Sequence, residues 1–83
     1  MAQISLDLHL IYNKSRNIDD ALWGVIREAR EKNIDEVEII YGKGSGQLKK
    51  RVLKFLDRQE VKRTYRRIKK DPNNSGRVFV YFY

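Results

Sequence analysis

The chain is organised around residues 39–52, which read IIYGKGSGQLKKRV. An apolar, strand-like run enters three alternating glycines, and an amphipathic, helix-like pattern leaves them. Such a turn presents backbone N–H groups, unobstructed by side chains, at the positive end of a helix. Lys43, Lys49, Lys50 and Arg51 all lie within about two helical turns of it. The stretch therefore predicts an anion site, and phosphate is the anion that this basic turn favours.

Charge is distributed unevenly along the 83 residues. The first 42 residues carry five Lys and Arg against eight Asp and Glu, whereas residues 43–83 carry thirteen against three. The formal net charge of +7 therefore comes from the part of the chain that begins at the glycine turn. Such a positive field favours nucleic acid or an acidic surface as the partner, and a merely solvated basic surface is the alternative.

The composition also excludes several classes of protein. A chain of this length folds as one domain, residues 1–83, with one small core. It has no cysteine and a single histidine, so we predict neither disulfides nor a metal site built on cysteines or several histidines. There is no apolar run near the roughly 20 residues of a membrane span and no signal peptide before Ile4, so we expect a soluble, cytoplasmic protein. The chain is also compatible with a domain taken from a larger parent protein.

Hydrophobic periodicity predicts elements in the order β-α-β-α-β-β. The expected strands are residues 4–9, 37–41, 61–66 and 77–83, the expected helices are residues 18–32 and 46–59, and a loop is expected over residues 69–76. The first two strands should be parallel, because a helix joins them by a right-handed crossover. We therefore predict the α/β class, as an α+β two-layer sandwich of two helices on a mixed four-stranded sheet.

The carboxyl ends of the two parallel strands indicate where a ligand should bind. The first strand ends at Asp7 and His9, which point to the same side, and the second ends at Tyr41 and Gly42. We therefore expect a composite site in which a carboxylate, an imidazole and a phenol meet a glycine turn. Each part has a structural alternative: Asp7 could bond loop backbone, His9 could be a surface residue, and the glycines could serve only to turn the chain.

The turn matches neither of the common nucleotide-binding motifs. The fingerprint G-x-G-x-x-G needs a glycine where Gln47 stands, and the Gly-Lys-Ser/Thr of a P-loop does not occur. We therefore predict no nucleotide cofactor.

Two motifs give the chain a specific resemblance to a known family. Residues 6–9 read LDLH, and residues 41–48 read YGKGSGQL. In spacing and placement they resemble the Smr (small MutS-related) domain, whose patterns are L-D-L-H-G and H-G-x-G-x-G-x-L. The resemblance implies a fold similar to the C-terminal domain of translation initiation factor three, and it implies binding or cleavage of nucleic acid. Smr domains occur alone or at the C-terminus of MutS-like ATPases linked to recombination control and stalled ribosomes, so DNA repair and ribosome rescue are the implied settings.

The resemblance also implies functions for individual residues. Asp7 and His9 correspond to the acidic and imidazole members of the first motif, and Gly42, Lys43 and Gly44 correspond to the phosphate-binding turn.

Two residues depart from the family patterns. Leu10 replaces the glycine after the first motif, and Tyr41 replaces the histidine before the second. A tyrosine, with an ordinary pKa of about 10, can donate a hydrogen bond but is a poor base at neutral pH. Binding should therefore survive these changes better than cleavage would.

The first hypothesis is a DNA or RNA endonuclease. Asp7 would activate or orient water, directly or through a weakly bound Mg²⁺ or Mn²⁺ ion, while His9 and Tyr41 would assist proton transfer. A single carboxylate argues against a tightly bound two-metal centre. The scissile phosphate would lie on a turn made of Gly42, Lys43, Gly44, Ser45 and Gly46.

The second hypothesis is a binding module without chemistry, which docks on phosphates through Lys49, Lys50, Arg51 and Lys54. The third is a protein-interaction domain that uses the aromatic last strand. Trp23 lies beside the apolar stripe of the first helix, where a place on the flank of the core is expected and base stacking is the alternative. The sequence leaves open the choice between DNA and RNA and the oligomeric state.

Overall fold

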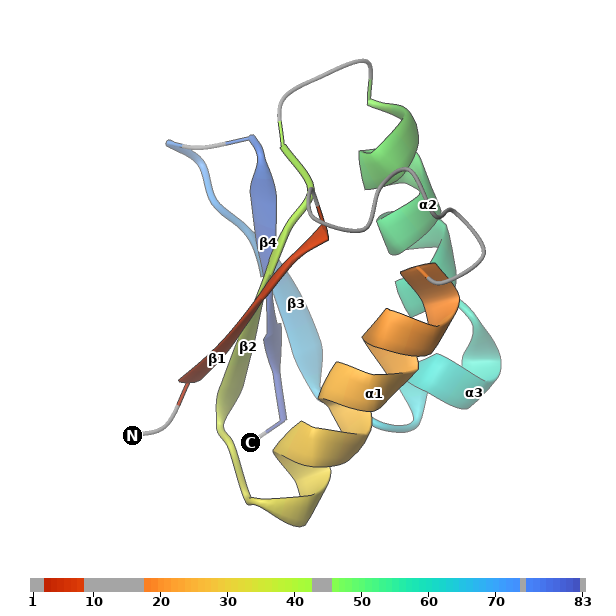
Figure 1. Cartoon of the computed structure of the whole chain (residues 1–83), viewed down its shortest axis with the longest axis vertical. Coiled ribbons are helices and arrows are strands. Elements are labelled where there is room, and N and C mark those ends of the chain that lie inside the picture. Colours follow the sequence, from red (N-terminus) through yellow and green to blue (C-terminus); the bar gives the residue numbers. More distant parts are fainter. Residues whose placement is uncertain (1–2, 9–17, 43–45, 74, 83) are drawn as a thin grey trace.

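The computed structural model describes residues 3–8, 18–42, 46–73 and 75–82. In chain order the elements are β1 (Gln3–Asp7), α1 (Ile18–Glu31), β2 (Glu36–Ile40), α2 (Gln47–Leu56), α3 (Gln59–Lys62), β3 (Arg67–Lys70) and β4 (Arg77–Tyr81). All three helices lie on one face of the sheet, which gives the domain two layers (Figure 1). None of the helices described here is long and apolar enough to cross a membrane.

The strands form one mixed sheet in the order β1-β2-β4-β3. β1 and β2 are parallel, as predicted, and β4 is antiparallel to both of its neighbours. α1 makes the crossover between the two parallel strands, and β2 then leads toward α2, so α1 and α2 both begin at the carboxyl end of the parallel pair (Figure 1). The predicted two-layer fold with a mixed four-stranded sheet is confirmed.

The core lies between the sheet and the helices. α1 and α2 each contribute a stripe of apolar residues at helical spacing, α3 contributes Val61, and the central strands contribute alternate residues. The fully buried residues with the largest side chains are Phe55, Leu8, Ile18, Leu22, Ile39, Leu56, Val37, Val52, Val61, Val78 and Val80. This interior fixes α1 and α2 against the sheet and thereby fixes the positions of their N-termini.

The strand expected over residues 61–66 is wrong, because the chain forms α3 and a turn there. In a strand, Arg63 would share a face with Val61 and Tyr65. Val61 is fully buried, however, while Arg63 is exposed. The Thr64 hydroxyl closes the turn by donating a hydrogen bond to the Val61 carbonyl oxygen, at 2.6 Å. Val61 and Tyr65 are also four residues apart, which is helical spacing, and burial of Val61 favours the helix.

Other boundaries differ from the expected ones by a few residues, as the ends of elements commonly do. α2 ends at Leu56 rather than at residue 59, because α3 follows as a separate helix. β3 extends to Lys70, into the loop expected from residue 69. β4 ends at Tyr81, and Tyr83 lies outside the described residues.

Candidate functional site

The carboxyl ends of β1 and β2 bring two sequence-distant stretches together. Asp7, the last residue of β1, is in register with Ile40, the last residue of β2, and Gly42 follows two residues later. Asp7 is exposed, whereas Leu6 beside it packs against the core. Because side chains alternate along a strand, Asp7 lies on the face of the sheet away from the helices. The structure therefore places the Asp7 carboxylate and the start of the glycine turn at one end of the sheet.

Two glycines of the turn have a left-handed backbone conformation. The φ angle is 80° at Gly42 and 86° at Gly46. Residues with a side chain rarely adopt this conformation, whereas glycine does so without steric cost. At Gly46 an added Cβ would meet no atom within 4 Å, so the backbone torsion alone requires glycine.

α2 begins at this end of the sheet with a first turn suited to an anion. Gly46 is its N-cap, and among the described residues no side chain caps the helix. The Gly46 carbonyl oxygen accepts the first helical hydrogen bond from the Lys50 N–H, at 3.0 Å. The first turn contains no acidic residue. Since the first N–H groups of a helix have no intrahelical partners and carry partial positive charge, they favour a phosphate oxygen.

Tyr41 supports the turn from inside the protein. Its side chain is only 3% exposed, and its hydroxyl donates a hydrogen bond to the Arg77 carbonyl oxygen at 3.2 Å. The Tyr41 and Gly42 N–H groups both donate to the Gly76 carbonyl oxygen, each at 2.9 Å. Burial raises the pKa of Tyr41, which keeps its hydroxyl protonated. The end of β2 is thus attached to the start of β4.

A polar network fixes the start of β4 in turn. The Arg77 guanidinium contacts Asp71 through Nη2 at 2.6 Å and Glu38 through Nη1 at 2.6 Å. The Ser5 hydroxyl donates to the other oxygen of the Glu38 carboxylate, at 2.7 Å. Hydrogen bonds to Asp71 first, and then to Glu38, raise the pKa of Arg77. Sequence reasoning missed these supporting residues, since nothing local in the chain indicates contacts between such distant positions.

The exposed side of α2 is strongly basic. Of the predicted phosphate contacts on α2, three are exposed: Lys50, Arg51 and Lys54. Lys49 is half-buried. Arg58 extends this row beyond the helix, and its guanidinium lies 5.2 Å from the centroid of the Phe55 ring. We call Lys50, Arg51, Lys54 and Arg58 the α2 basic face. Arg58 is not among the predicted phosphate contacts, although its spacing of four residues from Lys54 places it on the same side of the predicted helix.

Asp19, in the first turn of α1, holds two arginines of the α2 basic face. Its carboxylate pairs with Arg58 Nη2 at 3.0 Å and lies 3.7 Å from Arg51 Nε. These residues line a pocket of about 310 Å³ together with Lys50, Lys54 and Phe55. Partly exposed ion pairs add little stability, so their main consequence is to restrict the positions of the two guanidinium groups.

Several predicted site residues cannot be placed. His9, Lys43, Gly44 and Ser45 lie outside the described residues. Within residues 3–8, 18–42, 46–73 and 75–82, no three His, Asp or Glu side chains come together as candidate metal ligands.

These features define a class: a two-layer domain with a glycine turn and a basic helix at the carboxyl end of a parallel strand pair. The family model of the Smr domain matches residues 6–83, and the chain belongs to the Smr domain family. Among solved structures, the crystal structure of the Smr domain of Thermus thermophilus MutS2 has a TM-score of 0.65 and 19% identity, covering 100% of this chain and 99% of that chain. At this identity the likeness shows the fold alone. A search of the curated proteins gave no match.

Proposed function

We propose that this Smr domain binds nucleic acid where the glycine turn, the N-terminus of α2 and the α2 basic face meet. One observation carries the proposal. In the described part of the chain, the first turn of α2 has neither an acid nor a side-chain cap, and a row of exposed cations continues from this turn along the helix. One phosphate would lie at the N-terminus of α2, and the next would follow along the α2 basic face. Lys43, Gly44 and Ser45 would complete the turn around the first phosphate, and Lys49 would lie behind it.

We further propose that the domain hydrolyses a phosphodiester bond beside Asp7. The exposed carboxylate would orient and activate a water molecule, which adds to phosphorus while the bond to the leaving sugar oxygen breaks. His9, two residues farther along the first motif, would transfer the proton to that oxygen.

Binding without cleavage is the second candidate function, and Tyr41 is the observation that favours it. Tyr41 stands where the family pattern has histidine, and its hydroxyl faces the Arg77 carbonyl oxygen inside the protein. Its raised pKa opposes any function as a base. We therefore propose that Tyr41 positions the turn, and that Asp7 and His9 carry whatever proton transfer occurs.

The cellular setting is proposed from the same family membership. The similar solved domain belongs to a MutS2 protein. By analogy, we propose that this domain acts in the cytoplasm as part of, or beside, a MutS-like ATPase in recombination, repair or ribosome rescue.

A cleavage assay tests the catalytic proposal. Labelled supercoiled plasmid and structured RNA are incubated with the domain in the presence of magnesium, manganese or chelator. We expect Asp7→Ala to abolish cleavage, whereas Asp20→Ala, which removes an exposed acid from the first turn of α1, should leave it intact. Equal cleavage by Asp7→Ala and the parent protein would rule out Asp7. Binding without cleavage in every condition would leave the binding module as the function.

A further inference from the structure

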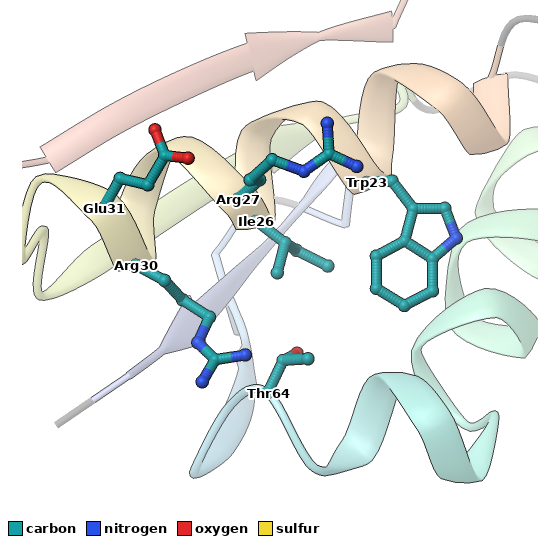
Figure 2. A pocket seen from close by; sticks show the side chains of 6 residues that line it. All are labelled: Trp23, Ile26, Arg27, Arg30, Glu31 and Thr64. Atoms are coloured by element: carbon teal, nitrogen blue, oxygen red, sulfur yellow. The ribbon is translucent and has the colours of Figure 1, made fainter.

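A pocket on the helical layer lies apart from the glycine turn, between α1 and the turn that follows α3. Its volume is about 430 Å³, and it is lined by Trp23, Ile26, Arg27, Arg30, Glu31 and Thr64. Figure 2 shows Ile26 in the middle, with the indole ring of Trp23 at one end and Arg30 at the other. Ile26 is buried, Trp23 is half-buried, and both arginines are exposed. The pocket therefore combines an apolar floor, an aromatic wall and two cations.

These groups match the parts of a nucleotide. A pocket of a few hundred Å³ accommodates one small ligand, which suits a single nucleotide rather than a duplex. The base of an unpaired nucleotide offers a flat surface to an aromatic ring, and the phosphates of the strand offer negative charge to arginines. Glu31 is the one acid among the lining residues, and it lies at the far end of the pocket from Trp23, with its carboxylate turned away from Ile26 (Figure 2).

The pocket adjoins the α2 basic face through Phe55. The Trp23 and Phe55 rings meet edge to face, with centroids 5.4 Å apart and an interplanar angle of 76°. Arg58 lies over the same Phe55 ring, and Asp19, one helical turn before Trp23, pairs with Arg58. The cations that we propose to bind phosphates are thus separated from the pocket by one aromatic contact.

We infer that this pocket takes one unpaired nucleotide of a strand that also lies on the α2 basic face, with the base stacked on Trp23 and phosphates on Arg27 and Arg30. The inference rests on the proposed nucleic-acid binding, and it specifies which form of nucleic acid is preferred. A paired base inside a duplex cannot present its face to a side chain without being unstacked. The preferred ligand is therefore a single strand, or a duplex that continues into a single strand.

Trp23 itself provides the test, because it is the single tryptophan of the chain and its fluorescence reports on this pocket. The protein is titrated at low salt with a single strand of about ten nucleotides, a blunt duplex of the same sequence, or polyglutamate. Anisotropy of a labelled strand measures binding in parallel. We expect the single strand to quench the Trp23 emission, and we expect the duplex to bind without quenching it.

Two matched variants locate the effect. Arg27→Gln/Arg30→Gln should weaken single-strand binding about tenfold and duplex binding less than about twofold. Arg67→Gln/Lys69→Gln removes the same charge from the face of the sheet away from the helices. This variant should cause only a small loss of affinity, of the same size for the single strand and for the duplex. Neither variant alters a buried residue, so the comparison does not depend on a destabilised fold.

The outcomes separate this inference from the proposed function. If both oligonucleotides bind but the Trp23 emission is unchanged and Arg27→Gln/Arg30→Gln binds like the parent, the pocket is not a nucleotide site, and the proposed function stands. If polyglutamate quenches Trp23 as strongly as the single strand does, the pocket serves an acidic peptide and the inference is overturned. If neither oligonucleotide binds at low salt, the proposed function fails and the inference fails with it.

Discussion

α1 and α2 begin at the same end of the sheet but carry opposite charges there (Figure 1). The first turn of α1 contains Asp19 and Asp20, whereas the first turn of α2 contains no acid and follows Gly46. Both helices bury an apolar stripe at the same spacing against the same sheet. The difference therefore concerns the surface that each helix presents and not how each helix packs.

In our proposal, this difference gives the two helices different functions. The acids of α1 complement the positive end of its own dipole, and Asp19 also holds Arg51 and Arg58. The first turn of α2 has no acid, and among the described residues no side chain caps it. In our proposal, α1 supports the binding surface at this end of the sheet and α2 forms it.

Removing the cations of α2 should have the largest effect. Lys50→Gln/Lys54→Gln should weaken duplex binding roughly 50-fold at about 0.1 M salt and lower the salt slope by about 1.8, because each lost phosphate contact removes about 0.9 from that slope. Anisotropy titrations across a range of salt concentrations measure both quantities.

The charge-matched variant Arg67→Gln/Lys69→Gln serves as the control, since these side chains lie on the opposite face of the sheet. Equal losses in the two variants would mean that net charge alone, and not the α2 basic face, attracts the nucleic acid.

A pair of glycine substitutions should have smaller effects of opposite sign. Gly46→Ala places a side chain at a φ of 86° and should lower the free energy of unfolding by about 1–2 kcal/mol. Gly24→Ala lies within α1, where the added Cβ meets no atom within 4 Å, and it should raise the free energy of unfolding by roughly 0.5–1 kcal/mol. Urea unfolding of both variants measures the difference.

Both sites have room for a methyl group, so the two substitutions separate backbone torsion from packing. A stability gain in Gly46→Ala would show that α2 can start without a left-handed N-cap, and the turn would not need this glycine.

The fold as far as the end of α2 could be predicted because each element has a clear periodicity and the glycines mark the boundary before α2. The next segment could not be predicted with the same success. α3 has only four residues, and Val61 and Tyr65 fit either an alternating or a helical pattern over so short a run. Burial of Val61 settles this ambiguity, and burial is a property of the whole fold.

The candidate site shows the same limit. Gly42, Gly46 and the lysines of α2 could be found because they follow one another in the chain. The contacts that support the site could not be found, because Arg58 reaches Asp19 and Arg77 reaches Glu38 across 39 residues. The motif placed Tyr41 at the site but could not show that its hydroxyl faces inward.

The smallest effect that we predict tests the comparison of the two helices most directly. Gln47→Glu gives α2 an acid in its first turn, as α1 has. The carboxylate should stabilise the helix dipole by about 0.3–1 kcal/mol and raise the melting temperature, while it repels the phosphate that we place there and weakens binding a few-fold. Gln3→Glu makes an equal change of charge on an exposed residue at the start of β1. It should leave binding unchanged, and it should not raise the melting temperature, because Gln3 is paired with Glu36 of β2. Thermal unfolding measures the stability of both variants, and anisotropy titration measures their binding. If Gln47→Glu is stabilised but binds as the parent does, no phosphate lies at the N-terminus of α2. The α2 basic face alone would then make the interface.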